Sequence, residues 1–154
     1  MVTQNPLQSY KRIAAQTASQ PQLVLMLYSG AVGFLERAIA AFSEKDPVQF
    51  SQQFTYNIQR AQAIIRELNV RLDMERGGEV AINLRLLYDY YFRHLNEALL
   101  HKSAKPIQDV LELLRTLRDA WQEMILRGPD APPPNIPAPP KPRNLEALST
   151  ALSP

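Results

Sequence analysis

The residues that could do chemistry in this chain are few and poorly placed for it. Its two histidines, His94 and His101, lie one heptad apart with Glu97 between them. A di-metal site in a helical bundle needs Glu-x-x-His pairs, so that a carboxylate and an imidazole share one helix face, and the sequence has no such pair. Both histidines fall on the polar side of a predicted helix. We therefore expect them to be solvated rather than to bind a metal.

Catalytic nucleophiles are equally unsupported. The chain has no cysteine, which excludes disulfides, thiolate metal sites and a cysteine nucleophile. It has no Gly-x-Ser-x-Gly elbow, and Gly77-Gly78 is too short to wrap a phosphate. The sequence therefore predicts that the protein is not an enzyme, with no catalytic residue, no cofactor and no metal.

The charge pattern argues against a nucleic-acid partner. Lys and Arg number 17 against 15 Asp and Glu, for a net charge of +2. A nucleic-acid binder clusters its basic side chains on one face, whereas acids and bases are interleaved here, as in Arg115, Arg118, Asp119 and Glu123. We expect a solvated surface of mixed charge.

The most apolar stretch, residues 23–42, does not predict a membrane span. Ser29, Glu36 and Arg37 interrupt it, so it falls short of the roughly 18 apolar residues that a span needs. The N-terminus lacks a basic region followed by an apolar one, which disfavours a secretory signal. The absence of cysteine fits a reducing compartment. We expect a cytoplasmic protein without membrane insertion.

Apolar residues recur every three or four positions in four segments, which predicts four helices. Connections of a few residues favour antiparallel neighbours, and no segment alternates with period two. The predicted fold class is all-α: an antiparallel up-down four-helix bundle preceded by a short N-terminal helical segment. Asp46 is the predicted cap of the second helix, and Gly77-Gly78 is predicted to end it. The four helices are expected at about 21–43, 47–74, 79–101 and 106–126.

The composition divides the chain into three parts. Residues 1–20 are predicted to form an N-terminal lid segment and residues 21–127 the helical bundle. Most of the 13 prolines follow Gly128, so residues 128–154 are predicted to be a proline-rich disordered tail, extended and polyproline-like. A weak amphipathic pattern over residues 145–152 leaves a docking motif open as an alternative.

The first long helix is more apolar than a bundle helix needs. At 100° per residue its polar residues fall on one narrow strip, spaced by sevens from Gln22 to Ser43. An apolar arc of a little over 100° is enough for a bundle helix. The surplus predicts a cover, since large apolar patches mark interaction sites. The cover is either a partner's amphipathic helix or the N-terminal segment with Tyr10 and Ile13, and a displaceable lid would combine the two.

The second helix carries a smaller apolar stripe. Tyr56, Ala63 and Val70 are spaced by sevens, roughly opposite the predicted core face. They are either scattered surface residues, which are normal, or a shallow second groove. From this periodicity we add Tyr56 and Val70 to the predicted partner-binding residues.

Several short motifs resemble the flagellin-specific export chaperones of bacteria, the FliS family. They occur in order at family-like spacing and cover about residues 5 to 126. They are Asn5-Pro6 with Tyr10, Gln16-Thr17-Ala18-Ser19, the run from Leu23 to Ala31, Leu68-Asn69-Val70-Arg71-Leu72-Asp73, Leu86-Leu87-Tyr88-Asp89-Tyr90 and Leu117-Arg118-Asp119-Ala120-Trp121. Three features depart from the pattern: Ser29 replaces Asp or Asn, Tyr91-Phe92 is bulky, and the proline-rich tail is additional.

The resemblance implies an antiparallel bundle that binds the C-terminal segment of newly made flagellin. Such a chaperone prevents premature polymerisation and keeps the cargo fit for the flagellar type III export gate, without ATP. Carried over position by position, the implied contacts are Tyr10 and Ile13 in the lid and Val24, Tyr28 and Leu35 on the first helix. A monomer or weak dimer is expected. The alternatives are a self-associating structural module and an adaptor for another helical cargo.

Overall fold

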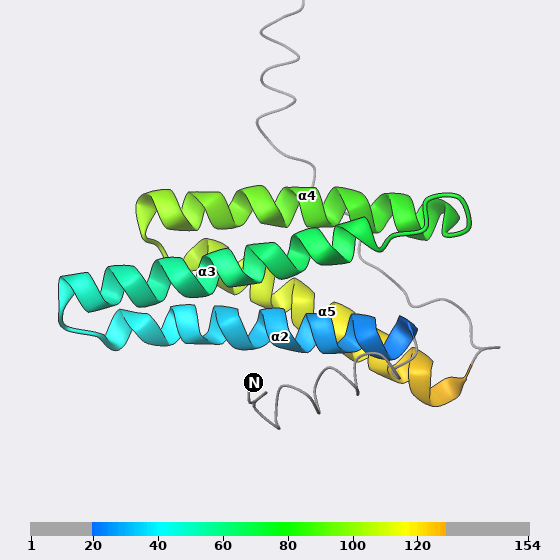
Figure 1. Cartoon of the computed structure of the whole chain (residues 1–154), viewed down its shortest axis with the longest axis horizontal. Coiled ribbons are helices and arrows are strands. Elements are labelled where there is room, and N and C mark those ends of the chain that lie inside the picture. The colour runs from blue at the N-terminus through cyan, green and yellow to red at the C-terminus, as the bar shows by residue number, and fades with distance from the viewer. Residues whose placement is uncertain (1–19, 129–154) are drawn as a thin grey trace, which may run out of the picture.

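The computed structural model describes residues 20–128, which form an all-helical bundle (Figure 1). Consecutive helices run in opposite directions, so the predicted antiparallel up-down four-helix bundle is confirmed, and the described part of the chain contains no strand. The elements are α2 (Gln20–Ala40), the short 3₁₀ helix η1 (Ala41–Ser43), α3 (Pro47–Val70), α4 (Gly78–His101) and α5 (Lys105–Arg127).

Local signals account for most helix ends. Asp46 caps α3 as predicted, because its Oδ1 accepts a hydrogen bond from the Val48 amide at 2.9 Å. Proline stands in the first turn of both α3 and α5, where its missing N–H costs nothing. Gly128 ends α5 with a φ of 92°, a conformation that glycine adopts without strain.

The prediction that the second helix continues to about residue 74 is wrong, since α3 ends at Val70. Asp73 is the physical reason. Its Oδ1 accepts hydrogen bonds from the backbone amides of Glu75, at 3.2 Å, and Arg76, at 3.0 Å. Such a local side-chain turn competes with the helical ladder, so the chain leaves α3 early and turns into α4.

The two glycines serve the start of α4 rather than the end of α3. Gly78 is the first residue of α4 and has a φ of 55°. At Gly77 an added Cβ would meet Ala81 Cβ at 2.5 Å and the Asp73 carbonyl oxygen at 2.6 Å. Only glycine fits at this close approach between the turn and α4.

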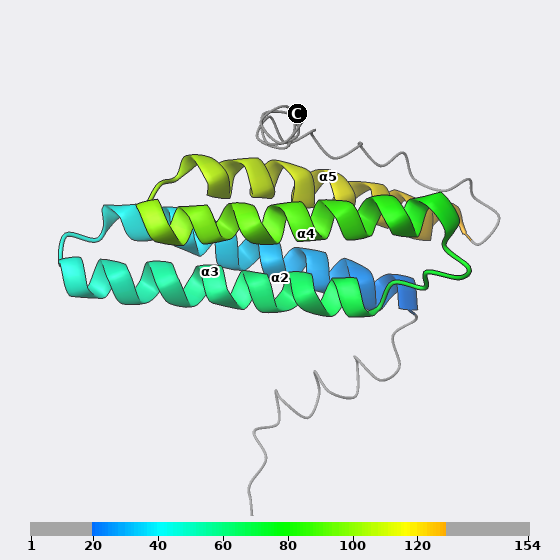
Figure 2. The same ribbon diagram turned by 90° about the horizontal axis from the view of Figure 1, so that it is seen from above.

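The helices pack in a ring in which α2 contacts α3 and α5, and α4 contacts the same two helices (Figure 2). The core is apolar and continuous, and each large buried side chain contributes about 1.5–3 kcal/mol. Its largest fully buried members are Tyr28, Phe54, Leu35, Ile58, Ile65, Leu87, Leu95, Ile107, Leu114, Leu117, Val32 and Val110.

Part of the apolar surface of α2 is used inside the bundle, where Tyr28, Ala31, Val32, Leu35 and Ala38 are buried. One side of the helix packs on α3, where the Phe34 ring meets Tyr56 at 6.4 Å between centroids. The other side packs on α5. Met26 and Phe42 stay 49% and 41% exposed. The stretch Gln20–Ser43 is long and apolar enough to cross a membrane by length and composition. Although it packs on α3 and α5, only 28% of its most apolar 18 residues is buried inside the bundle, so apolar surface remains for a cover.

Candidate functional site

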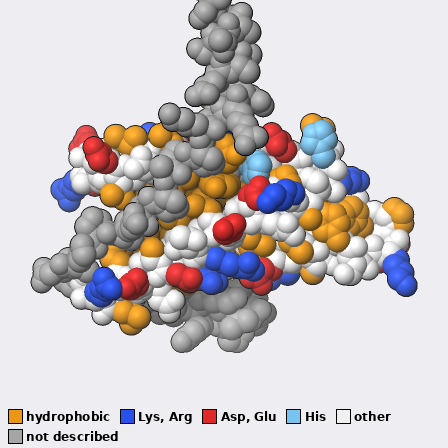
Figure 3. Space-filling view, turned by 180° about the vertical axis from the view of Figure 1, so that it is seen from behind, with side chains coloured by type: hydrophobic (Ala, Val, Ile, Leu, Met, Phe, Trp, Pro, Cys, Tyr) orange, Lys and Arg blue, Asp and Glu red, His pale blue; other side chains and the backbone are white. Residues whose placement is uncertain are grey.

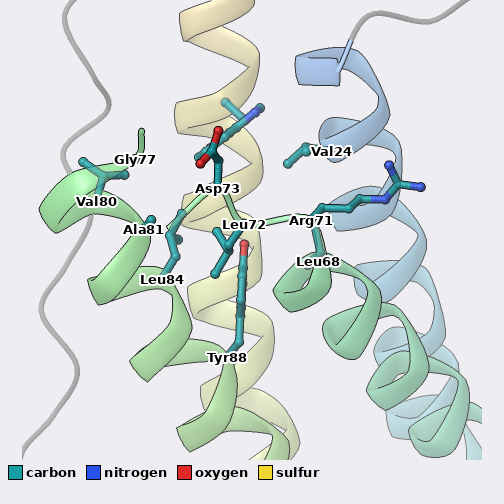
Figure 4. A pocket seen from close by; sticks show the side chains of 11 residues that line it. Val24, Leu68, Arg71, Leu72, Asp73, Gly77, Val80, Ala81, Leu84 and Tyr88 are labelled. Carbon is teal, nitrogen blue, oxygen red and sulfur yellow. The ribbon is translucent and has the colours of Figure 1, made fainter. Parts of the chain in front are cut away.

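An apolar pocket of about 200 Å³ opens at one end of the bundle, where α2 and α4 begin and α3 and α5 end. Figure 4 shows side chains from α2, α4 and the α3–α4 connection converging around it. Arg71 and Asp73 supply the charged groups in its lining. The lining residues are Val24, Leu68, Arg71, Leu72, Asp73, Gly77, Val80, Ala81, Leu84, Tyr88 and Trp121.

The α3–α4 connection shapes this pocket. Because the Asp73 turn ends α3 early, Leu72 lies in the connection and not in a helix. The close approach at Gly77 then starts α4 directly beside the turn. Val80, in the first turn of α4, and Val24, in the second turn of α2, complete the walls.

Two tyrosines form the layer beneath the pocket. The hydroxyls of Tyr28 on α2 and Tyr88 on α4 are hydrogen-bonded at 2.5 Å, across the diagonal of the bundle. Tyr28 also meets the Trp121 ring edge-on, at 5.8 Å between centroids. Burial raises the pKa of Tyr28 to about 12 and the pKa of Tyr88 still further. Both phenols are therefore neutral at physiological pH, and the pair closes the floor without charge.

Trp121 offers an unused hydrogen-bond donor at this site. Its Nε1 is buried and has no acceptor among residues 20–128. A buried donor without an acceptor costs about 1–3 kcal/mol. The pocket suits binding of a hydrophobic segment rather than catalysis.

The comparisons with known proteins decide the family. A family model described as flagellar protein FliS matches residues 3–128. The chain belongs to the FliS family. It is 32% identical over 125 residues to the flagellar secretion chaperone FliS of Bacillus subtilis, covering 81% of this chain and 90% of the relative.

Two further relatives agree. The flagellar secretion chaperone FliS of Salmonella typhimurium is 34% identical over 128 residues, covering 80% of this chain and 93% of the relative. That of Escherichia coli is 35% identical over 124 residues, covering 77% and 88%. Membership of the FliS family makes this chain a flagellar export chaperone. The family match stops at residue 128, so residues 129–154 lie outside it.

Of the predicted partner-binding residues in this FliS-family chain, Val24 lines the pocket. Tyr28 and Leu35 are fully buried, and their role as contacts stays a prediction. Their burial follows from their spacing: Val24, Tyr28 and Leu35 follow one another by four and seven residues, which places them on the face that α2 turns to the core. Tyr28 supports the pocket from below, and Leu35 lies deeper in the core cluster.

The stripe predicted on the second helix is exposed, as expected. Tyr56 and Val70 on α3 are 59% and 75% exposed, but neither lines the pocket. Their binding role stays a prediction. Tyr10 and Ile13, the two predicted lid residues, lie outside the described residues.

Periodicity did not distinguish the pocket residues from the core. In the sequence, Leu72, Val80, Leu84 and Trp121 each belong to an apolar stripe at helical spacing, and Tyr88 stands in a motif of the resemblance. A stripe shows which face is apolar, but not where two helices diverge and leave space between them. A cavity at the end of a bundle depends on that divergence.

One prediction about the histidines is corrected. His94 is only 18% exposed, and its Nε2 lies 3.0 Å from Asp109 Oδ2 on α5. It therefore links α4 to α5 instead of being solvated, whereas His101 is exposed as expected. Between residues 20 and 128, no three His, Cys, Asp or Glu side chains form a group that could hold a metal.

Proposed function

We propose that this FliS-family chaperone binds the C-terminal helical segment of flagellin in the cytoplasm. It thereby prevents premature polymerisation and keeps the cargo competent for flagellar type III export. The supporting observation is the apolar pocket at the open end of the bundle, with the unpaired Trp121 Nε1 in its lining. Family membership supplies the flagellar context.

The proposed mechanism is binding alone. An amphipathic cargo helix lays its apolar face against the chaperone and inserts a side chain between Val24 and Trp121. Removing apolar surface from water contributes about 25 cal/mol per Å², so no nucleotide, cofactor, metal or catalytic step is needed. A segment with Tyr10 and Ile13 would act as the displaceable lid over the same surface.

The residues predicted from the sequence as cargo contacts have different roles in this proposal. Val24 contacts the cargo directly, and Tyr56 and Val70 on α3 provide a second, shallower contact if the cargo wraps around the bundle. Tyr28 and Leu35, which are fully buried, act only by holding α2 in place. The export gate is a further proposed partner, and the protein acts as a monomer or weak dimer without nucleic acid or membrane insertion.

The deciding experiment compares two variants of the full chain. Val24→Glu places a charge in the pocket, whereas Met26→Glu places the same charge on the exposed side of the same helix. Calorimetry with a synthetic flagellin C-terminal peptide should show binding for the unmodified chain and Met26→Glu. Val24→Glu should lose at least about tenfold in affinity, because a buried unpaired charge is costly. Circular dichroism checks that both variants stay helical.

Equal affinity for the two variants would remove the pocket from the binding site. A peptide that bound neither variant nor the unmodified chain would remove flagellin as cargo. Sedimentation then separates the alternatives. A self-associating module would form a dimer that resists dilution, whereas an adaptor for another helical cargo would remain monomeric.

A further inference from the structure

A second hollow, of about 540 Å³, lies between α4 and α5 on the side of the bundle seen in Figure 3. Hydrophobic side chains gather on this face, with acidic, basic and histidine side chains beside them. The hollow is larger than the pocket at the bundle end and differs from it in chemistry. It is lined by Tyr90, Tyr91, His94, Asp109, Glu112, Leu113 and Thr116.

One wall of this hollow, called the α4–α5 groove below, is aromatic. Tyr90 and Tyr91 are adjacent on α4 and meet edge to face at 4.9 Å between centroids. The Tyr90 ring also stacks on His94, at 5.5 Å and 23°. Three adjoining rings therefore line this wall, with the Tyr91 ring nearly perpendicular to the other two.

The opposite wall, on α5, is acidic. Asp109 is already paired, with Lys105 Nζ at 2.9 Å and His94 Nε2 at 3.0 Å. Glu112, one turn further along, is exposed and forms no ion pair within 4.0 Å in the described part of the chain, although the Lys105 ammonium interacts with it at longer range. Burial raises the pKa of Tyr91, and the nearby Tyr90, Asp109 and Glu112 raise it further.

Aromatic rings beside the unpaired carboxylate of Glu112 suit a proline-rich segment that also carries basic residues. Polyproline helices are preformed and dock into aromatic-lined grooves at low entropic cost. Lysine or arginine beside the prolines would pair with the Glu112 carboxylate. The groove has no such cation for Glu112 among its own lining residues.

This chain contains such a segment. Residues 129–142 hold most of its prolines, and Lys141 and Arg143 interrupt and follow them. The segment lies outside the part that matches the FliS family, so the family's shared function does not explain it.

The proline-rich segment is long enough to reach the acidic wall of the groove. Glu112 lies sixteen residues before Gly128 on α5, about 24 Å along the helix axis. The thirteen residues from Gly128 to Lys141 would span about 40 Å if they were extended as a polyproline helix. The segment can therefore turn back at Gly128 and run antiparallel to α5, with its basic residues at the acidic wall.

We propose that residues 132–143 dock in the α4–α5 groove of the same chain, with prolines on Tyr90 and Tyr91 and with Lys141 or Arg143 paired to Glu112. Because the segment is tethered, its effective concentration at the groove is in the millimolar range, so weak contacts are enough. The docked segment covers this face reversibly. The proposal does not depend on flagellin as cargo.

Because the chain has no cysteine, one introduced cysteine can be labelled without removing any other. Ala138→Cys in the full chain gives a single thiol for a nitroxide label. Relaxation enhancement of the backbone amides should be strongest on α4 and α5 around Tyr91 and Leu113, and weak around Tyr56 on α3. Glu112→Lys should abolish the localised enhancement, and raised salt should reduce it.

A matched control and a rescue make the result specific. Glu67→Lys reverses an exposed carboxylate on α3 and should leave the enhancement unchanged. Combining Glu112→Lys with Lys141→Glu and Arg143→Glu should restore it, because the charges are exchanged. Enhancement spread evenly over the bundle, enhancement centred on another face, or an unchanged pattern in Glu112→Lys would each overturn the proposal.

Discussion

At the scale of single residues, the hydrogen bond between Tyr28 and Tyr88 is the polar contact on which the site depends. It joins two helices that pack on common neighbours but barely on each other. Both side chains are buried, so neither hydroxyl can turn to water if it loses its partner. The pair therefore fixes the distance between α2 and α4 directly beneath the pocket.

We expect Tyr88→Phe to lower the free energy of unfolding by about 1–3 kcal/mol, because it leaves the Tyr28 hydroxyl buried without a partner. The double variant Tyr28→Phe with Tyr88→Phe should be less destabilised than the sum of the two single variants. The two residues form one coupled unit. Urea unfolding of the four proteins measures this coupling. Strictly additive effects would show that the hydroxyls do not depend on each other.

At the scale of elements, α4 and α5 are joined by a short chain of ion pairs. Asp109 on α5 contacts His94 on α4 and Lys105 on its own helix. Burial acts to raise the pKa of Asp109, but the hydrogen bonds and charges of Lys105 and His94 outweigh it and hold the pKa below its ordinary value. These contacts also form one end of the α4–α5 groove.

The pH dependence of Asp109 follows from the sign of that shift. A carboxyl with a lowered pKa in the folded state stabilises the protein above its unfolded pKa, and the contribution is lost as pH falls through the folded value. Asp109→Asn should therefore be less stable than the unmodified chain at pH 7, with the difference shrinking below about pH 4. Urea midpoints across pH 2–7 measure it. Asp119→Asn, on an exposed carboxyl, serves as control, and a difference independent of pH would contradict the assignment.

The sequence predicted the elements better than their ends. Four apolar stripes and the cap at Asp46 were enough for the four helices, because both signals are local. The end of α3 was missed because Asp73 could equally have continued an exposed helix face. Its turn becomes preferred only with Gly77 packed against Ala81. His94 was missed because its partner, Asp109, lies on another helix.

At the scale of the whole molecule, the pocket exists because four helix ends meet without filling the space between them. Residue types alone could not locate it: Val24 and Leu35 are both apolar and share one face of α2. Val24 lies at the open end, whereas Leu35 lies in the middle of the bundle. The position along the bundle, rather than the sequence pattern, separates a binding residue from a core residue.

Because Leu35 lies in the middle of the bundle, its truncation should affect stability and leave binding unchanged. Leu35→Ala should lower the free energy of unfolding by about 2–5 kcal/mol, as expected for a large buried side chain that leaves a cavity. At a temperature where the variant remains folded, its affinity for the flagellin peptide should equal that of the unmodified chain, since Leu35 contacts only the core. Thermal unfolding and calorimetry on the same sample test both parts. If affinity fell while stability did not, Leu35 would have to become accessible in the complex, and the bundle would have to open to receive its cargo.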